Sequence, residues 1–322
     1  MRASDSGHRP AVASGFRTLV SWAGVASVLI GLFGVAGCRS ASAGPGTVRQ
    51  RVIDVVAAEN FWGSIAAQLG GVHARVHSII TNPDADPHSY EPTAADARAV
   101  AGANLVLENG IGYDPWVGRL LSADSPLPAT IDVGTSLGLT NGANPHRWYN
   151  PGDVRAVIET IVRSYRRLDP ADGAYFDAKE TWFENVALRP YDAAISSVRS
   201  RFHGTPVGAS ESIFSMLAPA LGLDLITPAS FLKAISEGTD VSASDKQTAD
   251  RQIMDHAIKI YVYNSQNVTP DVQVQLAEAR AAHIPVTTIT ETLAPAGTTF
   301  QTWQTFQLLR IEAALASAAS SH

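Results

Sequence analysis

Two histidines and two glutamates of this chain have the side-chain chemistry and the placement of metal ligands. His88 and His146 stand in proline-flanked loops of the N-terminal half, and Glu211 and Glu291 follow predicted strands of the C-terminal half. Neutral imidazole and ionised carboxylate groups are ligands that zinc, manganese and iron accept. Two neutral histidines and two ionised glutamates also balance the charge of a 2+ ion. The set predicts a site for a divalent transition metal, with two ligands from each half.

The elements that position these loops alternate along the N-terminal half. Runs of apolar and β-branched residues predict strands, and apolar residues three or four positions apart predict helices. A β-α-β order implies a parallel sheet with helices on both faces. The expected strands cover residues 51–57, 76–80, 104–107 and 130–133, and the expected helices cover 60–69, 93–102, 116–121 and 153–168.

A long helical segment, residues 171–202, separates this pattern from its continuation. Few strand signals interrupt it, although Pro190 is expected to kink or break it. A helix of this length between two sheet patterns is interpreted as a connector between lobes. The strand–helix order then resumes, with expected strands at 206–209, 224–227, 258–263 and 284–289 and expected helices at 213–221, 244–256, 270–282 and 299–317.

The sequence therefore predicts an α/β protein of two lobes, each a mostly parallel sheet flanked by helices. The N-terminal lobe is expected over residues 51–170, the linker helix over 171–202 and the C-terminal lobe over 203–322. Ligands of open α/β sheets bind at the carboxyl ends of the strands. Two facing lobes would place those ends, and the four candidate ligands, around one inter-lobe cleft. The remaining histidines, His73 among them, are expected on the surface.

The N-terminus has the parts of a bacterial lipoprotein signal. A stretch with three arginines precedes an uncharged apolar segment, and Val-Ala-Gly then leads to Cys38, the single cysteine. Residues 1–37 are predicted to be the signal peptide, Cys38 the lipidation site and residues 38–50 a flexible tether rich in serine, glycine and alanine. The alternative is an uncleaved membrane anchor, because 19 apolar residues can span a bilayer. Both place the body outside the cytoplasm, held at the cell membrane.

Composition narrows the functional classes. The chain has 322 residues, of which 45% are hydrophobic, and a net charge of −6. This apolar content supports a packed core and excludes wholesale disorder. The negative charge argues against nucleic-acid binding, which requires a basic surface. A lone cysteine excludes an intramolecular disulfide and a cysteine-based zinc ribbon.

Several strings, in order, resemble one protein family. The N-terminal strings are AAENFWGSIAAQLGG, DADPHSYEPTAADARAVAGANLVLENGIGYD and NPHRWYNP. The C-terminal strings are SESIFSMLAPALGLD, ISEGTDVSASDKQTADRQI, VYNSQNVTP and IPVTTITETLAPAGTTFQTW. Together they resemble the periplasmic metal-binding proteins of zinc and manganese ABC importers, the TroA/ZnuA-like or cluster A-I solute-binding lipoproteins. The resemblance spans residues 50–318 and implies two α/β lobes joined by one long helix, with metal between them.

The resemblance also implies roles for individual residues. His88 matches the first ligand of the family and His146 the second, Glu211 falls where relatives have His or Glu, and Glu291 falls where many have Asp. Glu237 is the rival candidate for the fourth ligand. Asn264 and Gln266 stand at another strand end and are interpreted as hydrogen-bonding residues that orient the ligands.

The expected function is capture of one divalent metal ion outside the cytoplasm and its delivery to an ABC permease. Zinc is placed ahead of manganese, although residues 121–144 lack the histidine-rich loop of many zinc-specific relatives. No organic cofactor, enzymatic activity or nucleic-acid partner is expected. The chain has no GxxxxGK[ST] motif, so the transmembrane permease subunit and its ATPase must be other chains. A monomer is expected.

Two other functions remain open at this point. A surface adhesin or interaction protein with a vestigial metal site is the first, although no repeat or stalk supports it. A zinc hydrolase is the second. A catalytic zinc keeps three protein ligands and an open position, whereas four ligands are predicted here and HExxH is absent.

Overall fold

The structure is a computed structural model, and it describes residues 52–83, 85, 87–123, 126–295 and 297–320. The predicted signal peptide, the lipidation site Cys38 and the tether lie outside the described residues. Within the described residues, no helix combines the length and the apolarity needed to cross a bilayer. Residues 52–168 form the N-terminal half, and residues 203–320 form the C-terminal half.

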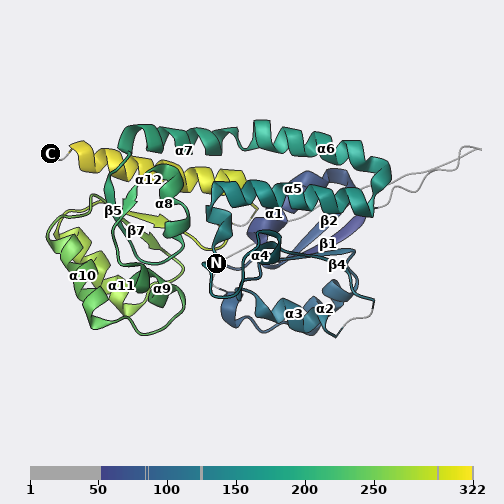
Figure 1. The fold of residues 1–322 in the computed structure, drawn as a ribbon, viewed down its shortest axis with the longest axis horizontal. Coiled ribbons are helices and arrows are strands. Elements are labelled where there is room, and N and C mark those ends of the chain that lie inside the picture. Colours follow the sequence, from purple (N-terminus) through teal and green to yellow (C-terminus); the bar gives the residue numbers. More distant parts are fainter. Residues whose placement is uncertain (1–51, 84, 86, 124–125, 296, 321–322) are drawn as a thin grey trace, which may run out of the picture. The chain divides into compact units, whose positions relative to one another are not determined.

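The N-terminal half contains a four-stranded parallel sheet in the order β2-β1-β3-β4. The strand β1 is central and almost wholly buried, which suits the unbroken apolar run of its sequence. Helices cover both faces of the sheet, as the β-α-β order predicts (Figure 1). The strands are β1 (Ile53–Glu59), β2 (Ala74–Ile80), β3 (Leu105–Glu108) and β4 (Ala129–Asp132).

The two faces of this sheet are packed differently. One face joins α1 and α5 in the large core, and the other packs α2 and α3 against a smaller apolar cluster around Trp116. The side chain of Thr93 caps α2 by accepting the backbone amide of Asp96, and the Asp96 side chain accepts the backbone amide of Thr93. The helical elements are α1 (Asn60–Gly70), η1 (Gly71–His73), η2 (Pro87–Ser89), α2 (Ala94–Ala101), α3 (Pro115–Leu121), α4 (Val133–Ser136), η3 (Arg147–Tyr149) and α5 (Pro151–Leu168).

The C-terminal half repeats the arrangement with a second four-stranded parallel sheet, in the order β6-β5-β7-β8. These strands are short: β5 (Pro206–Ala209), β6 (Asp224–Leu225), β7 (Tyr261–Asn264) and β8 (Val286–Ile289). The helical elements are η6 (Phe214–Met216), α8 (Ala218–Leu221), α9 (Ala229–Ser236), α10 (Ala243–Met254), α11 (Pro270–Ala281) and α12 (Phe300–Ser320). The prediction of an α/β fold with two parallel sheets is confirmed.

The long helical segment between the halves is present but interrupted. It comprises η4 (Pro170–Asp172), α6 (Gly173–Trp182), the π-helical η5 (Phe183–Ala187) and α7 (Arg189–Phe202). Pro190 occupies the first turn of α7, where backbone N–H groups have no intrahelical acceptor. The N–H that proline lacks therefore costs no hydrogen bond there. The proline therefore starts a new helix, and Leu188 forms the junction.

In the C-terminal half, one expected helix is divided and one helix was not expected. The predicted helix 213–221 is two short pieces, η6 and α8, separated by Leu217, and Pro219 stands at the start of the second. The sequence reading missed α9, although Phe231, Leu232 and Ile235 give it an apolar face. This omission matters because α9 reaches the candidate metal site.

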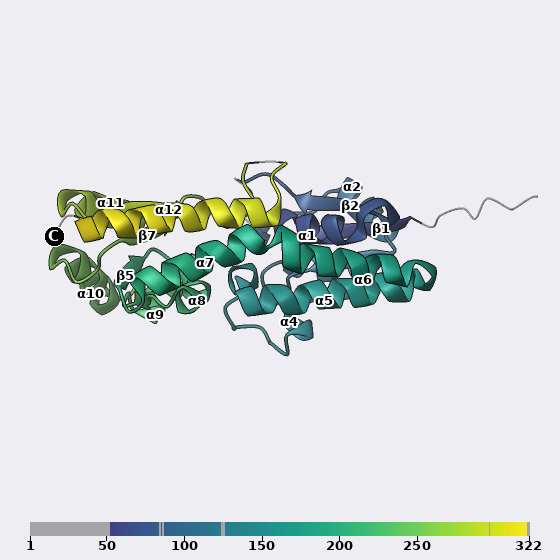
Figure 2. The ribbon, with the colours of Figure 1, turned by 90° about the horizontal axis from the view of Figure 1, so that it is seen from above.

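The C-terminal helix α12 packs against both halves. It runs beside α7 and reaches α1 (Figure 2). The Phe300 amide donates to Ser64 Oγ at 3.0 Å, and the amides of Gln68 and Gln301 bond each other at 2.7 and 3.1 Å. One large core accordingly contains buried residues from Ile53 through to Ala318 and includes side chains of both halves.

Candidate metal centre

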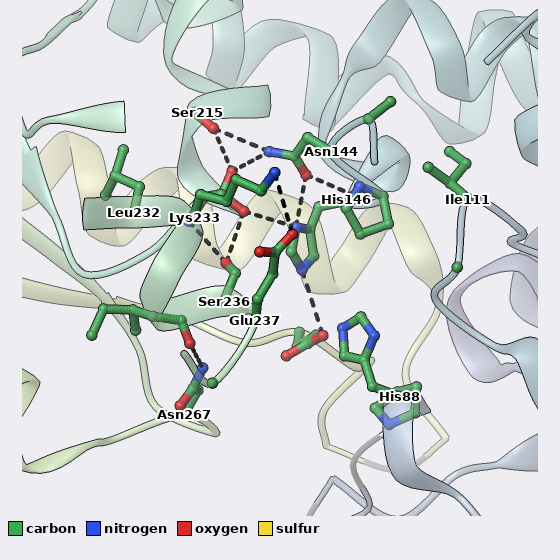
Figure 3. Close-up of a pocket in the computed structure, with 18 of the residues that line it drawn as sticks. His88, Ile111, Asn144, His146, Ser215, Leu232, Lys233, Ser236, Glu237 and Asn267 are labelled. Atoms are coloured by element: carbon green, nitrogen blue, oxygen red, sulfur yellow. Dashed lines mark hydrogen bonds and ion pairs between the residues drawn. The ribbon is translucent and has the colours of Figure 1, made fainter. Parts of the chain in front are cut away.

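A cavity of about 790 Å³ lies between the two halves. Its lining includes His88 and His146 from the N-terminal half and Glu237 from the C-terminal half (Figure 3). Glu291 and Gln266 of the C-terminal half also line it. The loops that line it follow the carboxyl ends of strands, where the topology of parallel sheets places binding sites. Three of the four candidate ligands thus share one cavity, and the fourth, Glu211, lies behind its wall.

His146 is held in a defined orientation by its own loop and by the opposite half. Its Nδ1 lies 2.8 Å from Asn144 Oδ1, while the Asn144 amide donates to Ser212 O at 2.7 Å and to Ser215 Oγ at 3.2 Å. Since Asn144 uses its NH₂ group on the C-terminal half, its oxygen faces the imidazole, and Nδ1 carries the proton. The buried ring therefore directs Nε2 into the site.

Glu291 meets His146 across the cavity. Its Oε1 lies 3.5 Å from His146 Nε2 and accepts a bond from the Tyr113 hydroxyl at 3.0 Å. Burial would raise the pKa of the Glu291 carboxyl, but the hydrogen bond and charge of His146, the charge of His88 and the Tyr113 bond together lower it. Glu291 is therefore an ionised ligand candidate.

Glu211 is buried beside Glu291 and shares a partner with it. The Asn264 amide donates to Glu211 Oε1 at 2.6 Å and to Glu291 Oε2 at 3.2 Å, and Asn267 donates to Glu211 Oε2 at 2.7 Å. Burial, with the nearby charge of Glu291, raises the pKa of Glu211 to about 8 despite these bonds. Without a cation, two carboxylates this close do not both ionise readily at neutral pH.

His88 lies beside Tyr113, close enough to Glu291 for its charge to act on that carboxyl. It lies on η2, is exposed, and its ring centroid is 4.8 Å from that of Tyr113. No three of the four candidates place ligand atoms within 4.8 Å of one another; among the described residues, a single His/Asp group elsewhere meets that criterion. The structure thus joins His146, Glu291 and Glu211 through short contacts, and His88 completes no three-ligand group with them.

The rival carboxylate Glu237 lies at the rim. It is exposed and forms an ion pair with Lys233, 3.6 Å away on α9 (Figure 3). Glu291 rather than Glu237 is the carboxylate that contacts His146. The helix α9 also sends Ser236 to Ser212, with 2.7 Å between their hydroxyl oxygens.

The predicted orienting residues act in different ways. Asn264 contacts both glutamates directly. The Gln266 side chain instead donates to Thr292 Oγ1 and accepts from the Thr292 backbone amide, each at 2.9 Å. Gln266 therefore fixes the loop next to Glu291. Sequence reasoning missed Asn144 and Tyr113, although Asn144 stands two residues before a candidate ligand, where an Asx turn is common.

A buried carboxyl pair supports the His146 loop. Asp114 accepts the backbone amides of Asn109 and Gly110 at 2.7 and 2.8 Å, and the Asn109 side chain donates to Pro145 O at 3.0 Å. Glu59 is fully buried beside Asp114, and among the described residues neither of its oxygens has a donor. Burial, then the Asp114 charge, raises its pKa well above the usual range. The protonated form of Glu59, which this burial favours, can donate to Asp114.

The arrangement suits tight binding of a cation rather than chemical turnover. It brings together a buried imidazole nitrogen, an ionised carboxylate and a second carboxyl group that a cation would deprotonate. Each of these groups is hydrogen-bonded by a residue that fixes its direction, as is typical of metal ligands.

A family model for the periplasmic zinc-uptake complex component A matches residues 55–314. The match includes the loops and strand ends that bear all four candidate ligands. The family consists of solute-binding transport proteins rather than enzymes.

Individual relatives are more distant. An iron-binding protein of Yersinia pestis is 30% identical over 167 residues, which cover 49% of this chain and 53% of that protein. A manganese-binding lipoprotein of Bacillus subtilis is 32% identical over 166 residues, or 48% and 53%. The chain spans about half the length of the curated relatives it matches. A manganese-bound periplasmic metal-binding protein of Candidatus Liberibacter asiaticus shares the fold, with a TM-score of 0.67, 20% identity, and coverage of 82% of this chain and 99% of that one.

Proposed function

The chain belongs to the family of periplasmic zinc-uptake component A, and on that premise we propose that it captures a divalent transition metal for an ABC importer. The pair formed by His146 and Glu291 carries the proposal, because it joins a nitrogen and a carboxylate ligand from opposite halves at 3.5 Å. Glu211 supplies a third ligand and His88 a fourth, once the η2 loop moves toward the pair.

The ligand set fits zinc or manganese. Two imidazoles and two carboxylates neutralise a 2+ ion, and zinc binds such ligands more strongly than manganese does. Zinc is therefore placed first. Manganese is the alternative, and its binding would require a site geometry that favours it or a greater supply of manganese outside the cytoplasm. The names of relatives support this range, since proteins described as iron-, manganese- and zinc-binding all resemble this chain.

The remaining parts of the proposal concern place and partners. Lipidation at Cys38 and a tether over residues 38–50 would hold the body, residues 51–322, at the outer side of the cell membrane. A transmembrane permease subunit with a separate ATPase would accept the metal. Contact with that permease would disturb the ligands of one half, because α12 and the segment 170–202 restrict separation of the halves.

The test offers metal-stripped protein equal concentrations of Zn²⁺ and Mn²⁺ and measures bound metal by mass spectrometry. We expect zinc at the cavity, and loss of that metal from His146→Ala and from Glu291→Gln. Glu237→Gln is the matched control, since it removes one carboxylate from the rim of the same cavity.

Each outcome decides one part of the proposal. Manganese retained against competing zinc would make this a manganese carrier. Equal metal binding by Glu291→Gln and the unsubstituted protein would remove Glu291 from the site, and weakened binding by Glu237→Gln would put Glu237 in its place. Absence of metal at the cavity would refute the proposed function.

A further inference from the structure

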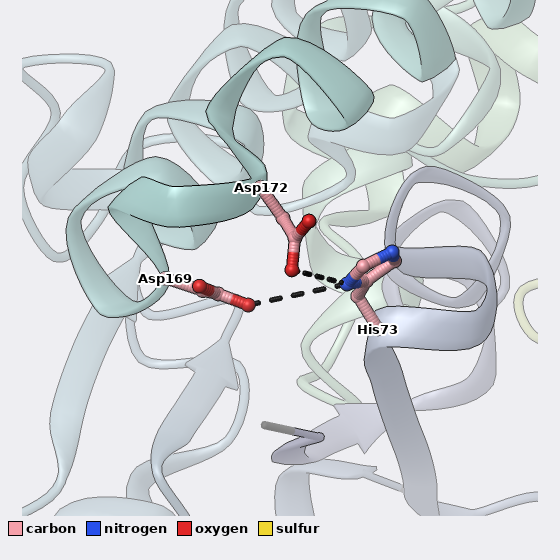
Figure 4. Close-up of side chains that lie close together, drawn as sticks. All are labelled: His73, Asp169 and Asp172. Atoms are coloured by element: carbon pink, nitrogen blue, oxygen red, sulfur yellow. Dashed lines mark ion pairs between the residues drawn. The ribbon is translucent and has the colours of Figure 1, made fainter. Parts of the chain in front are cut away.

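A second group of candidate ligands lies away from the cavity, at the amino end of β2. His73 ends η1, and Asp169 and Asp172 stand at the turn between α5 and α6 (Figure 4). One ligand atom from each residue lies within 4.8 Å of the other two. The carboxyl end of β2 leads instead to His88, so this group and the cavity lie at opposite ends of the strand.

The distances within this group match a metal polyhedron. His73 Nδ1 lies 2.9 Å from Asp172 Oδ2 and 3.9 Å from Asp169 Oδ2. Nitrogen and oxygen ligands about 2.1 Å from a tetrahedral zinc are about 3.4 Å apart, which falls between these two values. Small side-chain adjustments would therefore let all three atoms contact one ion.

The carboxylate of Asp169 is the observation that points to a ligand. Asp169 is 6% exposed, and among the described residues its Oδ2 atom has no hydrogen-bond partner, although it faces the imidazole. The two arginines that precede it are engaged elsewhere: Arg166 pairs with Asp177 at 3.2 Å, and Arg167 bonds Ser164 Oγ at 3.0 Å. A buried carboxylate oxygen without a donor is costly unless a cation or proton meets it.

Hydrogen bonding from the imidazole alone would not serve both carboxylates of the group. A single N–H can serve only one carboxylate, and Asp172 already takes the shorter contact. A cation would bind both carboxylates at once.

The imidazole of His73 is held in place by the residues around it. The sequence reading placed His73 on the surface, but the structure buries it to 6% exposure against Tyr175 and Phe176, at ring-centroid distances of 4.3 and 5.7 Å. Gly71 makes the turn that brings His73 there, with φ +51°, and a Cβ atom at Gly71 would lie 2.1 Å from the Tyr175 hydroxyl. Asp172, with a side chain 37% exposed, leaves a path for the ion and for water ligands.

We propose that His73, Asp169 and Asp172 form a second binding site for a divalent transition metal, zinc in the first instance. The bound ion would fasten the turn between α5 and α6 to the start of β2. Its role would be to stabilise the N-terminal half, independently of the metal held in the cavity.

The test uses protein whose cavity is disabled by His146→Ala with Glu291→Gln, and Zn²⁺ alone as the probe. We expect this protein to bind one zinc per chain, and zinc to raise its melting temperature. Adding Asp169→Asn should weaken that binding at least about tenfold. Loss of a residue that only orients a metal ligand already weakens binding by about this factor, and Asp169 is proposed as a ligand itself. Asp177→Asn is the matched control, because it removes one carboxylate from the same helix end without removing a ligand.

The outcomes separate this site from the cavity. Asp172→Asn, at the more exposed position, should weaken zinc binding as Asp169→Asn does and covers the case in which the latter fails to fold. Absence of stoichiometric zinc from the cavity-disabled protein, or equal binding after Asp172→Asn, would overturn the proposal and leave an ordinary histidine–aspartate ion pair. If the cavity itself binds no metal, the unsubstituted and cavity-disabled proteins will bind the same single zinc.

Discussion

His146 Nε2 lies 3.5 Å from Glu291 Oε1, so the two halves of the protein meet through an imidazole and a carboxylate. The position between these atoms is where a metal would bind. Asn144 bonds the opposite ring nitrogen, Nδ1, of His146, and Tyr113 donates to the same oxygen, Oε1, of Glu291. The strength of metal binding should therefore depend on residues that never touch the ion.

Asn144→Ala tests the orientation of the imidazole. Without the Asn144 oxygen, Nδ1 loses its acceptor and the ring can turn Nε2 away from Glu291. We expect metal affinity to fall roughly 10- to 100-fold, measured by competition with a chelating dye. Asn141→Ala, on the same wall of the cavity, is the control and should bind like the unsubstituted protein. Unchanged affinity in Asn144→Ala would show that the ring needs no support from this residue.

Glu211→Gln tests the proton that the metal must displace. The pKa of Glu211 is raised to about 8, so at pH 7 the metal-free protein holds a proton there, and binding should release it. We expect Glu211→Gln to bind metal more weakly and to release about one proton fewer at pH 7. Calorimetry in buffers of different ionisation enthalpy measures this release. An equal release from both proteins would exclude Glu211 as its source.

Glu59→Gln tests the buried carboxyl pair. The folded state raises the pKa of Glu59 well above 4.5, so it holds a proton that the unfolded chain gives up as the pH rises past that value. Relative to Glu59→Gln, the unsubstituted protein should lose stability above about pH 4.5, by up to about 1.4 kcal/mol per pH unit. At lower pH the difference between the two free energies should become constant.

Urea unfolding between about pH 4 and 8 measures the free energies for this comparison. Glu159→Gln is the control, because Glu159 is exposed and paired with Arg163 on the helix surface. Its difference from the unsubstituted protein should change little over the same range. A parallel pH dependence of Glu59→Gln and the unsubstituted protein would mean that Glu59 titrates normally.

Tyr149→Phe tests the link between the His146 loop and the Glu291 loop. The Tyr149 hydroxyl donates to Thr290 O at 2.7 Å, and its loss should cost about 1–3 kcal/mol of folding free energy. Tyr165→Phe is the control, since it removes a bond of the same kind to Ala66 O within the N-terminal half. Both should destabilise the protein, but only Tyr149→Phe should weaken metal binding. Equal metal affinity of the two variants would argue against this link.

The sequence predicts the framework well because strand runs and helix spacing report burial directly. The order of strands in both sheets places His88, Glu211 and Glu291 after strand ends, as expected. What the sequence does not contain is the distance across the cavity. His88 and Glu237 both fit a ligand pattern, yet His88 forms no three-residue ligand group with the other candidates and Glu237 is paired with Lys233 at the rim.

The residues that the sequence reading missed depend on long-range contacts. Asn144 matters through Ser212 and Ser215 of the other half, and His73 is buried by aromatic residues of α6. Neither contact leaves a periodic or local pattern. The helix α9 was overlooked although Phe231, Leu232 and Ile235 have helical spacing.

The attachment of α12 to α1 bears on how the protein melts. Each sheet could serve as the centre of a separately folding domain, but the large core continues from one to the other. Loss of either half would expose the apolar face of α12 that it covers. Heat should therefore unfold the described body in a single cooperative transition, and the calorimetric and van't Hoff enthalpies should agree.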